Sequence, residues 1–74
     1  MPFDSISAVL PAYDEEENIE KATRDMAAVL DSLDLRDWEV IVVDDGSKDR
    51  TSEICDRLVA EDPQHIRVFH HQPN

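Results

Sequence analysis

Glycine and cysteine are scarce in this chain, with one residue of each, and each shortage argues against a kind of structural feature. The 74 residues include one glycine, so there is no glycine-rich loop of the kind that holds phosphates in Rossmann or P-loop nucleotide sites. The single cysteine, Cys55, has no partner for an internal disulfide. It falls in a predicted helix near Ile54 and Leu58, where we expect a small buried thiol.

Basic residues and long apolar runs are also few. Seven Lys and Arg stand against 18 Asp and Glu, which gives a net charge of -11. Binding to nucleic-acid phosphates is therefore disfavoured, and we interpret the acidic surface mainly as a solubility feature. No run approaches the roughly 18 apolar residues of a membrane span, and Met1 to Asp4 does not resemble a signal peptide. These absences lead us to expect a cytoplasmic location.

The apolar residues that are present form short runs typical of strands. The predicted strands are Ser5 to Leu10, Trp38 to Val43 and Ile66 to His70. We expect Pro11 to close the first strand, because proline lacks a backbone donor. The near-continuous aliphatic second run predicts a strand buried on both faces. The alternating third run is typical of a strand nearer an edge.

Two helices are predicted between these strands. The first shows apolar residues three or four apart, with acidic residues loading its first turn. Its predicted inward residues are Ile19, Ala22, Met26, Val29, Leu30 and Leu33. The second helix runs from about Asp49 or Thr51 to Ala60, with Asp49 as a candidate N-cap. Its predicted inward residues are Ile54, Leu58 and Val59.

The order strand, helix, strand, helix, strand predicts an α/β fold with a parallel sheet and right-handed crossovers. A chain of this length forms at most one small domain and buries only about 60% of its unfolded surface. We therefore expect its stability to be marginal when it stands alone.

The loops from Pro11 to Glu17 and from Asp44 to Ser47 follow the first two strands. Ligands of open parallel sheets bind at this carboxyl edge. Carboxylates there can accept hydrogen bonds from a ribose or a base or hold Mg²⁺, and Tyr13 offers a face for stacking. From spacing alone, the loops either form a nucleoside pocket or simply cap the sheet.

Two motifs in these loops resemble a known family. Val9 to Ile19 reads V-L-P-A-Y-D-E-E-E-N-I, and Glu39 to Thr51 reads E-V-I-V-V-D-D-G-S-K-D-R-T. Their sequence, order and separation resemble the opening of glycosyltransferase family 2, especially the dolichol-phosphate mannosyltransferase and polyprenyl-phosphate glycosyltransferase type. The resemblance covers nearly the whole chain and implies a GT-A (Rossmann-like) fold.

The resemblance implies a nucleotide-sugar site on these motifs. Its residues would be Pro11, Ala12, Tyr13, Glu15, Asp44 and Asp45. Tyr13 would lie against the base, Asp45 would accept a hydrogen bond from it, and Asp44 would support Asp45 or the ribose. Ser47 could cap the following turn. Asp14 departs from the Asn that is most usual after this Tyr in the family, which adds a charge to the pocket.

The same resemblance implies that residues 1–74 are the N-terminal nucleotide-binding part of one glycosyltransferase domain. The D-x-D type motif that holds Mg²⁺ or Mn²⁺ in the family, and the carboxylate that serves as general base, come later in that pattern. Residues Gln72 to Asn74 look like the start of the next loop. We therefore expect no catalytic or metal-binding residue in this chain, and no activity from it alone.

For the full-length protein, the resemblance implies sugar transfer from a UDP- or GDP-sugar to a lipid phosphate or glycan, with inversion. Such enzymes serve cell-envelope and polysaccharide synthesis. It also allows attachment to the cytoplasmic face of a membrane through segments beyond this chain.

Two other functions are compatible with parts of the sequence. A receiver-type signalling domain also has an acidic pair after an aliphatic strand, but it carries a phosphorylated Asp at the end of the third strand, where this chain has Phe69, His70 and His71. The chain could also be a non-catalytic fragment.

A zinc site on the histidines is disfavoured because adjacent His70 and His71 would point to opposite sides of a strand. Glu15 to Glu17 lacks the spacing of a calcium loop.

Overall fold

The computed structural model describes residues 5–71, which form five elements in the predicted order. These are β1 (Ser5–Ala12), α1 (Ile19–Asp31), β2 (Asp37–Asp45), α2 (Thr51–Glu61) and β3 (Ile66–His71). The three strands form a parallel sheet in the order β1-β2-β3. The α/β prediction is confirmed, and β3 lies at an edge of this sheet as expected. The predictions for Met1 to Asp4 and for Gln72 to Asn74 lie outside the described residues.

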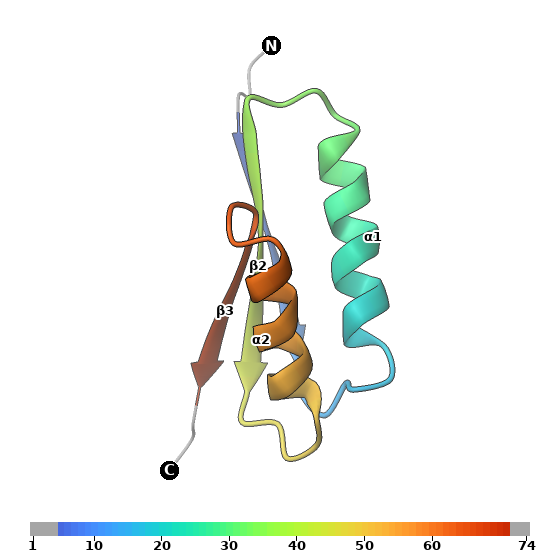
Figure 1. The fold of residues 1–74 in the computed structure, drawn as a ribbon, viewed down its shortest axis with the longest axis vertical. Helices are drawn as coiled ribbons and strands as arrows, with labels where there is room; N and C mark the ends of the chain where they lie inside the picture. The colour runs from blue at the N-terminus through green and yellow to red at the C-terminus, as the bar shows by residue number, and fades with distance from the viewer. Residues whose placement is uncertain (1–4, 72–74) are drawn as a thin grey trace.

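Both helices pack on the same face of the sheet (Figure 1). Right-handed crossovers between strands that are neighbours in both sequence and space require this arrangement. The core lies between the sheet and the helices. Its buried apolar residues are Ala12, Ile19, Leu30, Trp38, Val40, Val42, Cys55, Leu58 and Ile66. The burial expected for Cys55 is confirmed, and burial is the main reason that the pKa of its thiol rises to about 11.

The second face of the sheet is uncovered within the described residues. In β2, burial alternates along the strand: Val40 and Val42 are fully buried, whereas Ile41 and Val43 are only half-buried. The prediction that this strand is buried on both faces is therefore wrong for residues 5–71, because both crossover helices cover the same side. On the neighbouring edge strand, Phe69 is 61% exposed.

The first strand continues through Pro11 to Ala12, so the prediction that Pro11 ends it is wrong. Pro11 and Val43 are register partners, and the next pair is Ala12 with Asp44. β1 is an edge strand of the described sheet. Proline is tolerated at such an edge, where its missing N–H costs no ladder bond on the open side.

Helix α1 faces the sheet with part of the predicted apolar stripe, since Ile19 and Leu30 lie in the core and Met26 packs against it. Ile19 and Leu30 are buried as expected, but Val29 is 55% exposed and the fully buried residue between them is Thr23. Predicted inward Ala22 and Leu33 are likewise exposed. In α2, Leu58 is buried, whereas predicted Ile54 and Val59 are half-buried and Thr51 and Cys55 lie inside.

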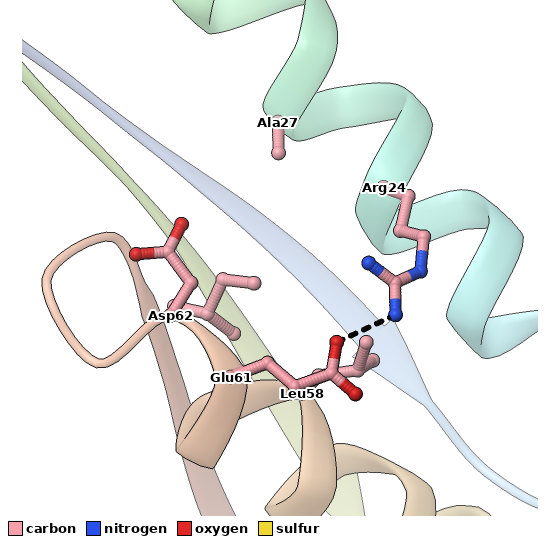
Figure 2. Close-up of a pocket in the computed structure, with 6 residues that line it drawn as sticks. Arg24, Ala27, Leu58, Glu61 and Asp62 are labelled. Atoms are coloured by element: carbon pink, nitrogen blue, oxygen red, sulfur yellow. Dashed lines mark hydrogen bonds and ion pairs between the residues drawn. The ribbon is translucent and has the colours of Figure 1, made fainter.

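The outer surfaces of the two helices are joined by ion pairs. The Arg24 guanidinium contacts the Glu61 carboxylate of α2 at 2.7 Å and the Glu20 carboxylate of its own helix at 3.0 Å. A pocket beside this pair, between α1 and the C-terminal end of α2, is shown in Figure 2. It lies at the opposite end of α2 from the loops that carry the sequence motifs. Neither α1 nor α2 has the length and apolar character needed to cross a bilayer.

Thr23 provides a test of this core. Its hydroxyl is fully buried and makes no hydrogen bond, which costs about 1 to 3 kcal/mol for an unsatisfied group. Thr23→Val replaces the hydroxyl with a methyl group of similar size. We expect it to raise the free energy of unfolding by about 1 kcal/mol in urea titrations followed by circular dichroism.

Thr51→Val is the matched control. The Thr51 hydroxyl is equally buried, but it donates to Asp49 and accepts from the Glu15 amide at 2.7 Å. This variant should lose about 1 to 3 kcal/mol. A loss of stability in Thr23→Val would show that its hydroxyl has a partner after all.

Candidate functional site

The two sequence motifs meet at the carboxyl end of the sheet. The β1–α1 and β2–α2 loops emerge together at the lower end of the molecule in Figure 1, where all three strands end. A parallel sheet forces this, because every strand runs in the same direction. The structure thus brings together two motifs that are well separated in the sequence: Asp14 contacts Ser47, 33 residues further along the chain. Ligands of open parallel sheets bind at this edge.

Hydrogen bonds from backbone to side chain clasp the two loops to each other. The Asp14 amide donates to Ser47 Oγ at 3.1 Å, the Glu15 amide to Thr51 Oγ1 at 2.7 Å and the Glu16 amide to Asp49 Oδ2 at 3.2 Å. Three consecutive amides of the first loop are therefore satisfied by side chains of the second. The loop that carries Tyr13 is fixed relative to the acidic end of β2.

Asp14 adds a contact in the opposite direction to these hydrogen bonds, which we call the clasp between the loops. Its carboxylate Oδ1 accepts a hydrogen bond from the Lys48 amide at 2.7 Å. Its backbone has φ of 50°, a left-handed conformation that Asp and Asn tolerate better than most residues. An Asn side-chain carbonyl could accept the same bond. The Asn that the resemblance implies at this position would therefore preserve the contact.

Asp44 is a buried carboxylate and is 1% exposed. Its Oδ1 accepts from the Ser47 amide at 3.2 Å, and its Oδ2 accepts from the Ser52 hydroxyl. The imidazole of His70 on β3 lies 2.8 Å from the same Oδ2. Both oxygens of Asp44 thus have hydrogen-bond partners within the protein. Because the side chain is also buried, it is poorly placed to contact a ligand directly.

These contacts shift two pKa values. Burial by itself opposes ionisation of Asp44, but the hydrogen bonds from Ser47, Ser52 and His70 outweigh it and lower its pKa to about 2. His70 also lies 2.7 Å from the carboxylate of Asp56 on α2. Hydrogen bonds to Asp56 and then to Asp44 raise the pKa of His70 above its ordinary value of 6.5. His70 therefore bridges two carboxylates as a cation.

Asp45, the next residue, has the opposite environment. Its side chain is 62% exposed, and its Oδ1 lies 2.9 Å from Nδ1 of His71. Successive side chains of a strand point to opposite faces, so Asp44 turns toward the helices and Asp45 away from them. The prediction that His70 and His71 point to opposite sides is confirmed by their different partners.

The remaining predicted site residues lie around this edge. Tyr13 is 52% exposed and follows Ala12, the register partner of Asp44. Ala12 is buried, so only its backbone can line a pocket. Pro11 and Glu15 line one shallow pocket beside the start of α1. Tyr13, Pro11 and Glu15 are thus accessible, whereas Ala12 and Asp44 lie beneath them.

The start of α2 differs from the prediction. The N-cap position is Arg50, and its side chain makes no capping bond, so Asp49 is not the N-cap. The Asp49 carboxylate nevertheless accepts from the Thr51 amide at 2.9 Å. It also receives the Glu16 amide of the other loop. From the position before Arg50, Asp49 therefore accepts hydrogen bonds from the start of α2 and from the first loop.

Sequence reasoning missed Ser52, His70 and His71 as parts of this site. Ser52 could have been found, because it is the second residue of the helix that follows the acidic loop. The two histidines depend on the register that pairs β3 with the acidic end of β2. Within residues 5–71, no group of three or more His, Cys, Asp or Glu side chains is arranged to hold a metal ion.

The bridge made by His70 predicts a pH dependence of stability. A raised folded pKa means that its stabilisation is complete below about pH 6.5 and is lost as pH rises through the folded value. We expect the free energy of unfolding to fall as the pH rises from about 6.5 through this folded value, because a neutral imidazole cannot donate to both carboxylates. Urea titrations across this range should show a much smaller fall in His70→Asn.

His65→Ala is the control for this pH dependence, because His65 stacks on Trp38 at the other end of the sheet. It should keep the pH dependence. An undiminished fall in His70→Asn would assign the effect to another group.

Comparison with known proteins agrees with this geometry. The profile of the family described as Glycosyl transferase family 2 matches residues 7–74. Glycosyltransferase AglD of Haloferax volcanii is 48% identical over 66 residues, which cover 88% of this chain and 10% of that protein. Undecaprenyl-phosphate 4-deoxy-4-formamido-L-arabinose transferase of Salmonella paratyphi A is 34% identical over 65 residues, covering 88% of this chain and 20% of that protein.

The same transferase of Salmonella choleraesuis is 32% identical over the same share of both chains. The chain thus spans between a tenth and a fifth of the length of these curated relatives. Its parallel βαβαβ segment is consistent with the Rossmann-like GT-A fold implied by its motifs. With a match over nearly its whole length, the chain belongs to glycosyl transferase family 2.

Proposed function

We propose that the full-length protein transfers a sugar from a nucleoside-diphosphate sugar to a polyprenyl-phosphate acceptor with inversion, and that this chain supplies recognition of the nucleoside. The observation that carries the proposal is the contrast at the end of β2. Asp44 is buried and held by the protein, whereas adjacent Asp45 is left exposed. The acidic pair thus combines one structural carboxylate with one that is free to accept from a ligand.

The nucleoside would bind across the ends of β1 and β2. The Asp45 carboxylate can accept from the ring N–H of uracil or of guanine, so either base suits it. The exposed ring of Tyr13 offers a stacking face on the neighbouring strand end. Pro11, Glu15 and the backbone of Ala12 would complete the wall. The clasp between the loops supports this role because it holds Tyr13 and Asp45 in fixed relation before a ligand arrives.

The acceptor is proposed from the relatives. The Salmonella proteins are named as transferases acting with undecaprenyl phosphate, and the motifs resemble the polyprenyl-phosphate type. Such an acceptor presents its phosphate at a membrane surface, and we place the reaction on the cytoplasmic side. A net charge of -11 repels anionic headgroups, so membrane attachment would come from other parts of the protein.

The proposed reaction is a displacement at the anomeric carbon. An acceptor phosphate oxygen forms a bond to this carbon from the face opposite the donor's diphosphate, and the carbon–oxygen bond to the diphosphate breaks with its electron pair. Mg²⁺ or Mn²⁺ would offset the charge on the leaving group. Since residues 5–71 hold no suitable cluster of ligands, we place the metal ligands and the chemistry outside them. These residues bind and orient the donor.

Calorimetric titration of the full-length protein tests the proposal. UDP, GDP and their sugar conjugates are titrated with and without Mg²⁺ or Mn²⁺, and CDP and ADP serve as controls for base recognition. We expect metal-dependent binding of a uracil or guanine nucleotide. The absence of binding by any nucleotide under every condition would reject the proposed function.

Two pairs of variants test the residues. Tyr13→Ala should weaken nucleotide binding by about 1 to 3 kcal/mol through lost stacking, whereas Tyr13→Phe should retain the affinity of the wild type.

Asp45→Asn should weaken nucleotide binding with little change in the free energy of unfolding. Asp44→Asn should lower the free energy of unfolding, because Asp44 is buried among its partners. Unchanged affinity in Tyr13→Ala, or global unfolding of Asp45→Asn, would remove that residue from the ligand site.

A further inference from the structure

The end of β3 carries a histidine that contacts the exposed carboxylate of the site. Asp45 and His71 are register partners on neighbouring strands, and Nδ1 of His71 lies 2.9 Å from Oδ1 of Asp45. Both side chains are about two-thirds exposed, at 66% and 62%. An exposed pair of this kind adds at most about 1 kcal/mol to stability. Its presence is therefore poorly explained by the needs of the fold.

The chemistry of the pair defines which atoms remain for a ligand. An ionised carboxylate only accepts hydrogen bonds, so Nδ1 of His71 carries the hydrogen and donates it. Because this bond uses Oδ1, the second oxygen of Asp45 is left for a ligand. A carboxylate on an open strand end would otherwise rotate freely, and that freedom would be lost on binding. The imidazole limits this rotation in advance.

Comparison with the neighbouring pair, His70 and Asp44, shows how the two histidine–aspartate contacts differ. His70 and Asp44 form the same kind of contact one residue earlier, but there the carboxylate is 1% exposed and is also held by Ser47 and Ser52. Two adjacent histidines thus hold two adjacent carboxylates on opposite faces of the sheet. The inner pair joins the core elements, and the outer pair faces solvent where the ligand is proposed to bind.

We propose that His71 is a positioning residue for nucleobase recognition, because it orients the Asp45 carboxylate toward the ring N–H of the base. This inference rests on the proposed function, and it adds a residue from the third strand to a site otherwise built from the first two. His71 acts through Asp45, so its contribution exists only while Asp45 can accept its hydrogen bond.

The test measures binding of UDP and GDP to the full-length protein by calorimetry. His71→Ala should weaken binding of whichever nucleotide the wild-type protein prefers by about 3- to 10-fold. His71→Asn should retain most of the affinity, since its amide N–H lies near the position of Nδ1 and can donate the same bond. His65→Ala, the matched histidine control at the opposite end of the sheet, should bind like the wild type.

A double-mutant cycle separates positioning from a general structural effect. In an Asp45→Ala background, which removes both acceptor oxygens, His71→Ala should cause little further loss. Binding of inorganic diphosphate, which has no base, should be the same in the wild type and in His71→Ala. Equal losses with and without the Asp45 carboxylate, or unchanged nucleotide affinity in His71→Ala, would overturn the inference and leave the proposed function intact. If the wild-type protein binds no nucleotide, both fail together.

Discussion

The buried carboxylate of Asp44 connects more of this structure than any other side chain at the strand ends. It sits at the end of β2 and is bonded to the turn through Ser47, to α2 through Ser52 and to β3 through His70. A buried charge is costly unless several donors satisfy it. Here these donors hold the carboxylate ionised, as its pKa of about 2 records. The position of the β2–α2 loop depends on this arrangement.

The clasp between the two loops extends that order to the first strand. The turn held by Asp44 presents Ser47, Asp49 and Thr51 to the amides of residues 14–16. The Asp14 carboxylate in turn accepts a hydrogen bond from the Lys48 amide. A chain with a single glycine thus orders the loops at the carboxyl edge of its sheet through side chains that accept hydrogen bonds from backbone amides. Many nucleotide-binding α/β proteins have glycine-rich turns at this edge instead.

Coverage of the sheet is one-sided in the described residues. Parallel sheets are ordinarily covered on both faces, yet α1 and α2 share one face, and Val9 and Phe69 are more than half exposed on the other. The net charge of -11 adds repulsion between copies of the chain.

The sequence alone determined the order of the elements, the parallel sheet, the family and the edge at which a ligand would bind. These features follow from local patterns, namely the aliphatic runs, the helical spacing and the two motifs. Such patterns can be recognised without knowing how the side chains pack. The sequence did not determine that β1 runs through Pro11, that Thr23 faces the core or that Asp49 is not the N-cap. Nor did it show that Asp44 is buried and bonded to His70 whereas Asp45 is exposed and bonded to His71. Only the tertiary structure decided these points, because burial, strand register and the partners His70 and His71 arise from contacts between segments distant in the chain.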